Sequence, residues 1–242
     1  MPRVNFWFSV LVSMVLTLSG MAEEKSPASA SEKDAPKTEA PVPKVTYVTT
    51  DTTTQGAWKE VYGSDGYVVI GDTQSLPAYA QMTVMTKKAN LANCGLYQYI
   101  EHTYIPSTTE VRALLNGAGT DRLVAGWFSY YLTLDLNFTD NQMHRIAIYC
   151  LDWKKSMAQK IEFLNPETDA VIDTRKIKGF DNGHYLVWDV KGHVHIKVSS
   201  MAEARAGVSG IFFQPTPPPT PPAAPVSAPA PAPAPAPAQP AK

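Results

Sequence analysis

Apolar and polar residues alternate along much of the chain between residues 45 and 213. In Leu132–Phe138 every second side chain is apolar, which is typical of a strand with one face on a core and the other in water. The segment Ile146–Leu151 is apolar on both faces and therefore predicts a strand in the middle of a sheet. Comparable patterns predict further strands near residues 45–50, 67–70, 80–85, 97–103, 122–128, 160–164, 171–177, 185–190, 194–198 and 207–213.

Turn-forming residues separate these segments, as in Ser64-Asp65-Gly66 and Asp181-Asn182-Gly183. One short helix is predicted at Thr108–Leu115, with Ser107 or Thr108 as its N-cap and Glu110 in its first turn. Many short strands and a single short helix predict an all-β fold, a single β-sandwich of the jelly-roll or galactose-binding-like type.

The pattern of residues 184–198 also predicts a local pairing. A three-residue loop, Lys191-Gly192-His193, would place Trp188 opposite Ile196 and leave one face of a hairpin wholly apolar. The same register would place Asp189 opposite His195, and Gly192 or His193 would adopt a left-handed backbone conformation.

Both ends of the chain differ in composition from this body. Residues 1–22 have the features of a signal peptide: Arg3, an apolar stretch from Phe6 to Leu18, and small residues at Gly20 and Ala22. An uncleaved N-terminal anchor is the alternative. Residues 23–44 predict a disordered linker, and residues 214–242 predict a disordered Pro/Ala-rich tail.

The chain is therefore expected to carry one β-sandwich domain, residues 45–213. It is expected to be exported to the periplasm, the cell envelope or the extracellular space, with no membrane span in the mature chain. The net charge is −1 and Lys and Arg form no block, which argues against nucleic acid as a partner. Cys94 and Cys150 are compatible either with a disulfide or with two free thiols, because spacing alone does not define the geometry of a bridge.

Motifs for catalysis are missing from the sequence. There is no Gly-x-Ser-x-Gly elbow, and Gly117-Ala118-Gly119 is too short to be a phosphate loop. Asp135 and Asp152 are a conceivable carboxylate pair for glycoside hydrolysis, which needs a specific separation across a cleft. The sequence gives no such separation, and Asp135 is expected on the solvent-facing side of its strand and Asp152 at a strand end. We therefore expect no enzyme activity, no catalytic residue and no cofactor.

His193 and His195 are weak candidates for a metal site, because residues two apart on a strand share a face. A metal site needs further ligands. His184, His144 and Asp189 are available, but the spacing does not place any of them beside the histidine pair. The prediction is therefore that no metal is bound.

Aromatic residues give a better indication of a binding surface, because flat rings bind the apolar C–H faces of sugars. The adjacent residues Trp127, Phe128, Tyr130 and Tyr131 cannot all face inward. Trp58, Trp153 and Trp188 are expected in the core. The predicted ligand-binding residues are Trp127, Tyr130, Tyr131, Tyr62 and Tyr67.

Several segments also resemble those of an uncharacterised module of secreted bacterial proteins, which is similar in layout to malectin-like and galactose-binding-like jelly rolls. The segments are 55–58 (QGAW), 61–67 (VYGSDGY), 112–114 (RAL), 146–153 (IAIYCLDW), 185–188 (YLVW) and 208–213 (VSGIFF), and the resemblance covers residues 54–213. It implies non-catalytic glycan binding at the rim of the sandwich, and it assigns no binding residue in this chain.

Two functions are consistent with these features. The first is an exported carbohydrate-binding module whose partner is a polysaccharide. The alternative is a structural or protein-binding component of the cell envelope, in which the Pro/Ala-rich tail acts as a spacer or docks an envelope protein.

Overall fold

The computed structural model describes residues 42–85 and 99–216. The predicted signal peptide, residues 23–41 of the predicted linker, Cys94 and the tail from residue 217 onward lie outside the described residues. In the described part of the chain, no helix is long and apolar enough to cross a membrane.

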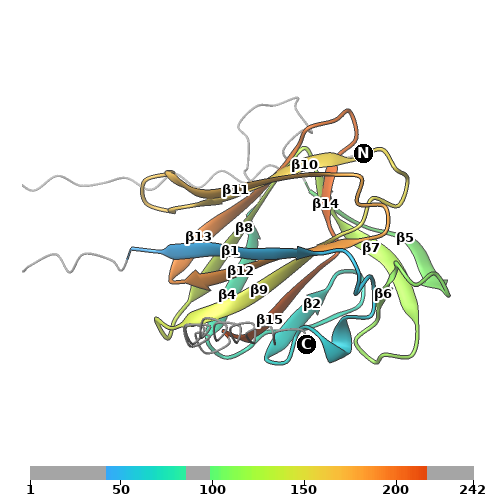
Figure 1. Ribbon diagram of the computed structural model, residues 1–242, viewed down its shortest axis with the longest axis horizontal. Coiled ribbons are helices and arrows are strands. Elements are labelled where there is room, and N and C mark those ends of the chain that lie inside the picture. The colour runs from blue at the N-terminus through green and yellow to red at the C-terminus, as the bar shows by residue number, and fades with distance from the viewer. Residues whose placement is uncertain (1–41, 86–98, 217–242) are drawn as a thin grey trace, which may run out of the picture. The chain divides into compact units, whose positions relative to one another are not determined.

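The fold is all-β, and every strand pairing in the described residues is antiparallel (Figure 1). The six-stranded sheet has the order β1 (Lys44–Asp51), β12 (His184–Lys191), β9 (Met143–Cys150), β15 (Gly210–Pro215), β2 (Gly66–Val69) and β3 (Thr73–Ser75). The five-stranded sheet has the order β11 (Val171–Lys178), β10 (Ala158–Leu164), β13 (His193–Ser200), β8 (Tyr131–Phe138) and β4 (Ala80–Met85).

The main core lies between these two sheets, as expected for a β-sandwich. Leu132, Leu134, Leu136 and Phe138 all point inward from β8 and are at most 3% exposed, so the period-two pattern of this segment is confirmed. They belong to one buried cluster with Ile146 and other residues of the opposite sheet. The segment predicted to be central, β9, lies between β12 and β15 in the six-stranded sheet.

A smaller sheet lies at one end of the sandwich (Figure 1). It has the order β14 (Ala206–Val208), β7 (Arg122–Ser129) and β5 (Ile100–Thr108), and β6 (Leu114–Leu115) also pairs with β7. Residues of β6 and β7 form a second buried cluster with Tyr149 and Tyr185 of the six-stranded sheet and with Trp58 of the 3-10 helix η1 (Trp58–Glu60). The six-stranded sheet is therefore covered on both faces there, which explains why residues 146–150 of β9 are apolar and buried on both faces.

The predicted hairpin at Lys191-Gly192-His193 is wrong. Gly192 has the predicted left-handed conformation, with φ +81°, but β12 pairs with β1 and β9, and β13 pairs with β10 and β8. The chain thus passes from one sheet to the other at this glycine. The apolar faces that contain Trp188 and Ile196 belong to the core between the sheets. Two apolar strand faces can be buried opposite each other as well as side by side, and the sequence pattern is the same in both cases.

The predicted helix at Thr108–Leu115 is also wrong, because Thr108 ends β5, turns follow, and Leu114 begins β6. Its apolar residues Ala113 and Leu114 are buried in the second cluster through this turn. Every predicted strand that the structure describes is present, although the segment 207–213 is divided at Ser209 between β14 and β15. Cys150 carries a free, buried thiol.

Candidate functional site

Two of the five predicted ligand-binding aromatics are buried. Trp127 is 8% exposed, and its indole Nε1 donates a hydrogen bond to Glu101 Oε2 at 2.9 Å. Tyr62 is 7% exposed; its ring stacks on Tyr185 with centroids 4.4 Å apart, and its hydroxyl donates to Asp51. These contacts make both residues parts of the packed interior, so they are not available as ligand platforms.

The other three predicted residues lie in different places. Tyr67 is half-buried and packs against Trp58, with centroids 4.7 Å apart. Tyr131 is exposed on the outer face of the five-stranded sheet. Only Tyr130, between β7 and β8, lines the cleft described below. The structure therefore does not bring the five residues into one site.

A cleft of about 320 Å³ lies beside the small sheet. Tyr104 from β5 and Phe128 from β7 contribute rings that meet edge to face, with centroids 5.3 Å apart. The loop after β9 contributes Trp153, which is half-buried rather than a full core residue, whereas Trp58 and Trp188 are buried as predicted. The full lining is Ile100, Tyr104, Val124, Phe128, Tyr130, Leu151, Trp153, Lys154, Ser156, Met157, Glu203, Ala204, Arg205 and Ser209.

Cationic side chains lie against the rings of this cleft. The Lys154 ammonium is 5.0 Å from the centroid of the Tyr104 ring, and the Arg205 guanidinium is 5.8 Å from that of Tyr130. The Tyr130 hydroxyl donates to the backbone carbonyl of Glu203 at 3.0 Å, which ties the 201–205 loop to the end of β7. The cleft thus combines aromatic rings with the charged hydrogen-bond donors Lys154 and Arg205.

Asp152 shapes one wall of the cleft. Its carboxylate is 2% exposed and accepts hydrogen bonds from the backbone N–H groups of Ser156 and Met157, at 3.0 and 2.8 Å. This confirms the expectation that Asp152 closes a turn at a strand end. The turn carries Trp153 and Lys154 into the cleft, so Asp152 acts on the site through the backbone.

Sequence patterns do not identify the cleft because its residues come from four separate segments. Tyr104 lies in a strand whose other residues are mostly polar, and Arg205 lies in a loop without a motif. The one available signal was the aromatic run that begins at Trp127, which does place Phe128 and Tyr130 at the cleft.

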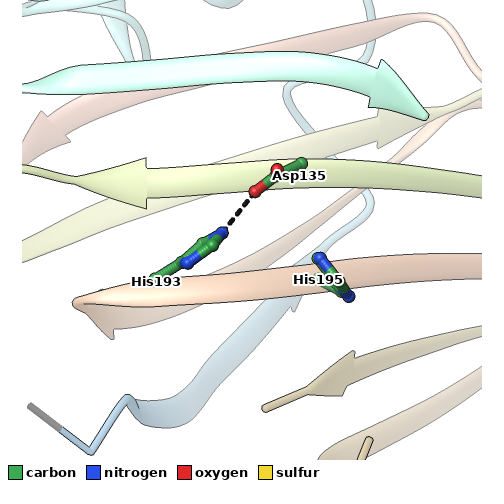
Figure 2. Close-up of side chains that lie close together, drawn as sticks. All are labelled: Asp135, His193 and His195. Atoms are coloured by element: carbon green, nitrogen blue, oxygen red, sulfur yellow. Dashed lines mark hydrogen bonds and ion pairs between the residues drawn. The ribbon is translucent and has the colours of Figure 1, made fainter. Parts of the chain in front are cut away.

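A second group of polar residues lies on the outer face of the five-stranded sheet. His193 and His195 project from β13 and Asp135 from the neighbouring β8 (Figure 2). His193 Nε2 and Asp135 Oδ1 are 2.5 Å apart, and Asp135 lies directly opposite His195 in the strand register. One potential ligand atom from each residue lies within 4.8 Å of the other two. The prediction that Asp135 faces outward is confirmed.

The other residues considered as metal ligands have different roles. Asp189 lies opposite Arg145 rather than His195, and the two form a bidentate ion pair with distances of 2.7 and 2.9 Å. His144 Nε2 is 2.8 Å from Asp140, and its ring stacks on Tyr79. The pKa of His184 is lowered, chiefly because burial disfavours the charged imidazole.

Comparisons with protein-family models, with curated proteins and with solved structures find no match for this chain.

Proposed function

We propose that the domain is a non-catalytic module of an exported protein and that it binds a carbohydrate in the cleft beside the small sheet. The observation that carries this proposal is the convergence of Tyr104, Tyr130 and Trp153 with Lys154 and Arg205 on one cavity. A volume of about 320 Å³ lies at the small end of ligand pockets, which span about 300–1,000 Å³. That size suits one or two sugar units of a longer chain.

The chemistry of the lining supports a hydroxylated ligand with apolar faces. The aromatic rings offer surfaces on which the C–H faces of a sugar ring pack. Lys154 and Arg205 offer charged donors to hydroxyl or carboxylate oxygens, and hydrogen bonds to charged groups are stronger than neutral ones. An acidic polysaccharide is therefore a better fit than a neutral one.

The lining favours binding over hydrolysis. Glu203 is the only carboxylate among the described residues that line the cleft. Glycoside hydrolysis uses two carboxyl groups across the scissile bond, one as acid and one as base or nucleophile. The proposed role is therefore capture of a glycan without its cleavage.

Affinity electrophoresis against a panel of acidic and neutral polysaccharides tests the proposal. The wild-type protein should be retarded by at least one acidic polysaccharide, and Tyr104→Ala should lose most of that retardation. Tyr131→Ala is the matched control, because Tyr131 is of the same type and similarly exposed (45% against 39%) but does not line the cleft. Thermal unfolding of each variant shows whether it keeps its fold.

If Tyr131→Ala is no longer retarded by the polysaccharide but Tyr104→Ala still is, the proposed cleft is wrong and the binding site lies on the outer face of the five-stranded sheet. No retardation by any polysaccharide would contradict the proposal and favour the alternative, a structural or protein-binding envelope component.

A further inference from the structure

The outer face of the five-stranded sheet gathers three potential metal ligands on two adjacent strands. His193 and His195 are two residues apart on β13, so they share a face. Asp135 on β8 pairs with His195 in the antiparallel register and contacts His193 (Figure 2). The group is independent of the proposed carbohydrate cleft, because none of its residues lines that cleft.

The backbone that carries these side chains is held in place from below. Val194, between the two histidines on β13, and Leu134 and Leu136, on either side of Asp135 on β8, are completely buried in the main core. Their packing fixes the strands, while the side chains above remain partly exposed, at 45% for His193 and 34% for Asp135. Ligands carried on strands of a packed scaffold are positioned more precisely than ligands carried on loops.

The distances are within reach of a coordination sphere. Ligand atoms bound to zinc at about 2.0–2.1 Å are about 3.4 Å apart in a tetrahedral site. The three ligand atoms here lie within 4.8 Å of one another, so rotations of the partly exposed side chains suffice to bring them together. The His193–Asp135 hydrogen bond has to yield when the ring nitrogen takes a metal in place of its proton.

We propose that Asp135, His193 and His195 bind a divalent transition-metal ion of the zinc type. Two imidazoles and one carboxylate form a mixed N/O set that suits zinc, copper, nickel or iron rather than calcium or magnesium. Three protein ligands leave at least one position for water or for an outside donor. That position borders a groove on the same face, because His195 also lines an open groove of about 810 Å³ together with Thr133, Lys197 and Asp169.

Isothermal titration calorimetry with zinc chloride at pH 7.5 tests this site in the full, tag-free chain after treatment with chelator. The wild type should bind one equivalent of zinc. His195→Ala removes a ligand and Asp135→Asn removes the negative charge of another, so each should weaken zinc binding at least about tenfold, since even changes to the outer-shell partners of metal ligands cost that much. His102→Ala should bind like the wild type, because His102 is an exposed histidine of β5 outside the cluster.

Histidine ring resonances in NMR spectra provide a second readout. Zinc should shift the ring signals of His193 and His195 and leave those of His102 and His184 in place. Three results would overturn the proposal. Zinc binding could survive in both His195→Ala and Asp135→Asn, it could fall equally in His102→Ala, or the wild type could show no stoichiometric binding. Equal melting temperatures of the variants exclude unfolding as the cause of any loss.

Discussion

Gln159 forms two hydrogen bonds with the backbone of Gly207 in the buried interior. Its Oε1 accepts from Gly207 N at 2.8 Å and its Nε2 donates to Gly207 O at 3.1 Å. The amide side chain, which is completely buried, therefore pairs with β14 as a neighbouring strand would. Gly207 follows the loop that carries Glu203 and Arg205, so this pair fixes one wall of the cleft beside the small sheet to the main sandwich.

Replacing Gln159 by Leu should lower the free energy of unfolding by about 2–4 kcal/mol. The change leaves a buried N–H and a buried C=O unpaired, and each such group costs roughly 1–3 kcal/mol. Urea unfolding followed by tryptophan fluorescence measures the loss. The control is Gln81→Leu, because Gln81 is exposed on β4 and a surface substitution should change the stability by less than about 0.5 kcal/mol. Equal losses in the two variants would contradict this account of Gln159.

Two glycines in the left-handed conformation should respond differently to alanine. Gly183 and Gly179 have φ +83° and +66°, so both substitutions cost about 1–2 kcal/mol through the backbone alone. A Cβ at Gly183 would collide with the Tyr149 hydroxyl, whereas a Cβ at Gly179 meets nothing within 4 Å. Gly183→Ala should therefore destabilise the protein by at least about 2 kcal/mol more than Gly179→Ala does in urea unfolding.

The steric clash in Gly183→Ala should also change the surroundings of Trp153 in the cleft. The Tyr149 hydroxyl donates to the backbone carbonyl of Arg112, and the Arg112 guanidinium lies 3.8 Å from the centroid of the Trp153 ring. Displacement of Tyr149 in Gly183→Ala should change the emission spectrum of Trp153, and the double variant with Trp153→Phe should lack that change. An unchanged spectrum in Gly183→Ala would show that Tyr149 moves without affecting the cleft wall.

Asp51 should make stability depend on acid pH. Burial on its own would raise the pKa of this carboxyl group, but hydrogen bonds from the side chains and backbone N–H groups of Thr54 and Thr53 outweigh it and hold the pKa below its ordinary value of 3.8. A lowered folded-state pKa contributes stability above pH 3.8 that is lost as the pH falls through the folded-state pKa. Asp51→Asn should therefore cost about 1–2 kcal/mol at pH 6, after screening by solvent. The difference from wild type should shrink below pH 3.8, and a constant difference from pH 6 to pH 2 would exclude this origin.

The Cys150 thiol should be inert while the protein is folded. Burial raises its pKa to about 12, although a hydrogen bond from Gln159 partly opposes the shift. The thiolate is the reactive form, so a Cys94→Ser variant should react with a disulfide reagent at pH 8 only as fast as it unfolds. Because the folded state retains the proton, the contribution of this group to stability falls as the pH rises from about 9 to about 12. Rapid labelling without denaturant would contradict the buried position.

The sequence pattern predicts strands well because each strand obeys a local rule. The alternation in β8 and the doubly apolar segment of β9 follow directly from which faces are covered. The same pattern does not predict which strands are neighbours. The apolar faces of Trp188 and Ile196 are buried whether their strands lie side by side in one sheet or face each other across the core. The helix at Thr108–Leu115 fails for a related reason: capping residues also suit the turn that leads Leu114 into β6.

Prediction of sites is limited by contacts between distant segments. Tyr62 and Trp127 are aromatic residues of the kind that binds sugars. In the structure, however, each is buried and donates a hydrogen bond to a carboxylate, Tyr62 to Asp51 and Trp127 to Glu101. His195 has the expected strand geometry, but its neighbour Asp135 is 60 residues earlier in the chain and becomes its partner only through the β8–β13 register. Such registers depend on the whole fold, and a single sequence pattern does not determine them.

The crossover between the two sheets at Gly192 affects how the domain unfolds. One residue separates β12, an interior strand of the six-stranded sheet, from β13, the middle strand of the five-stranded sheet. Neither sheet can separate from the core without displacing an interior strand of the other sheet. The sandwich should therefore melt as a single cooperative unit, with local opening confined to edge strands such as β3 and β4.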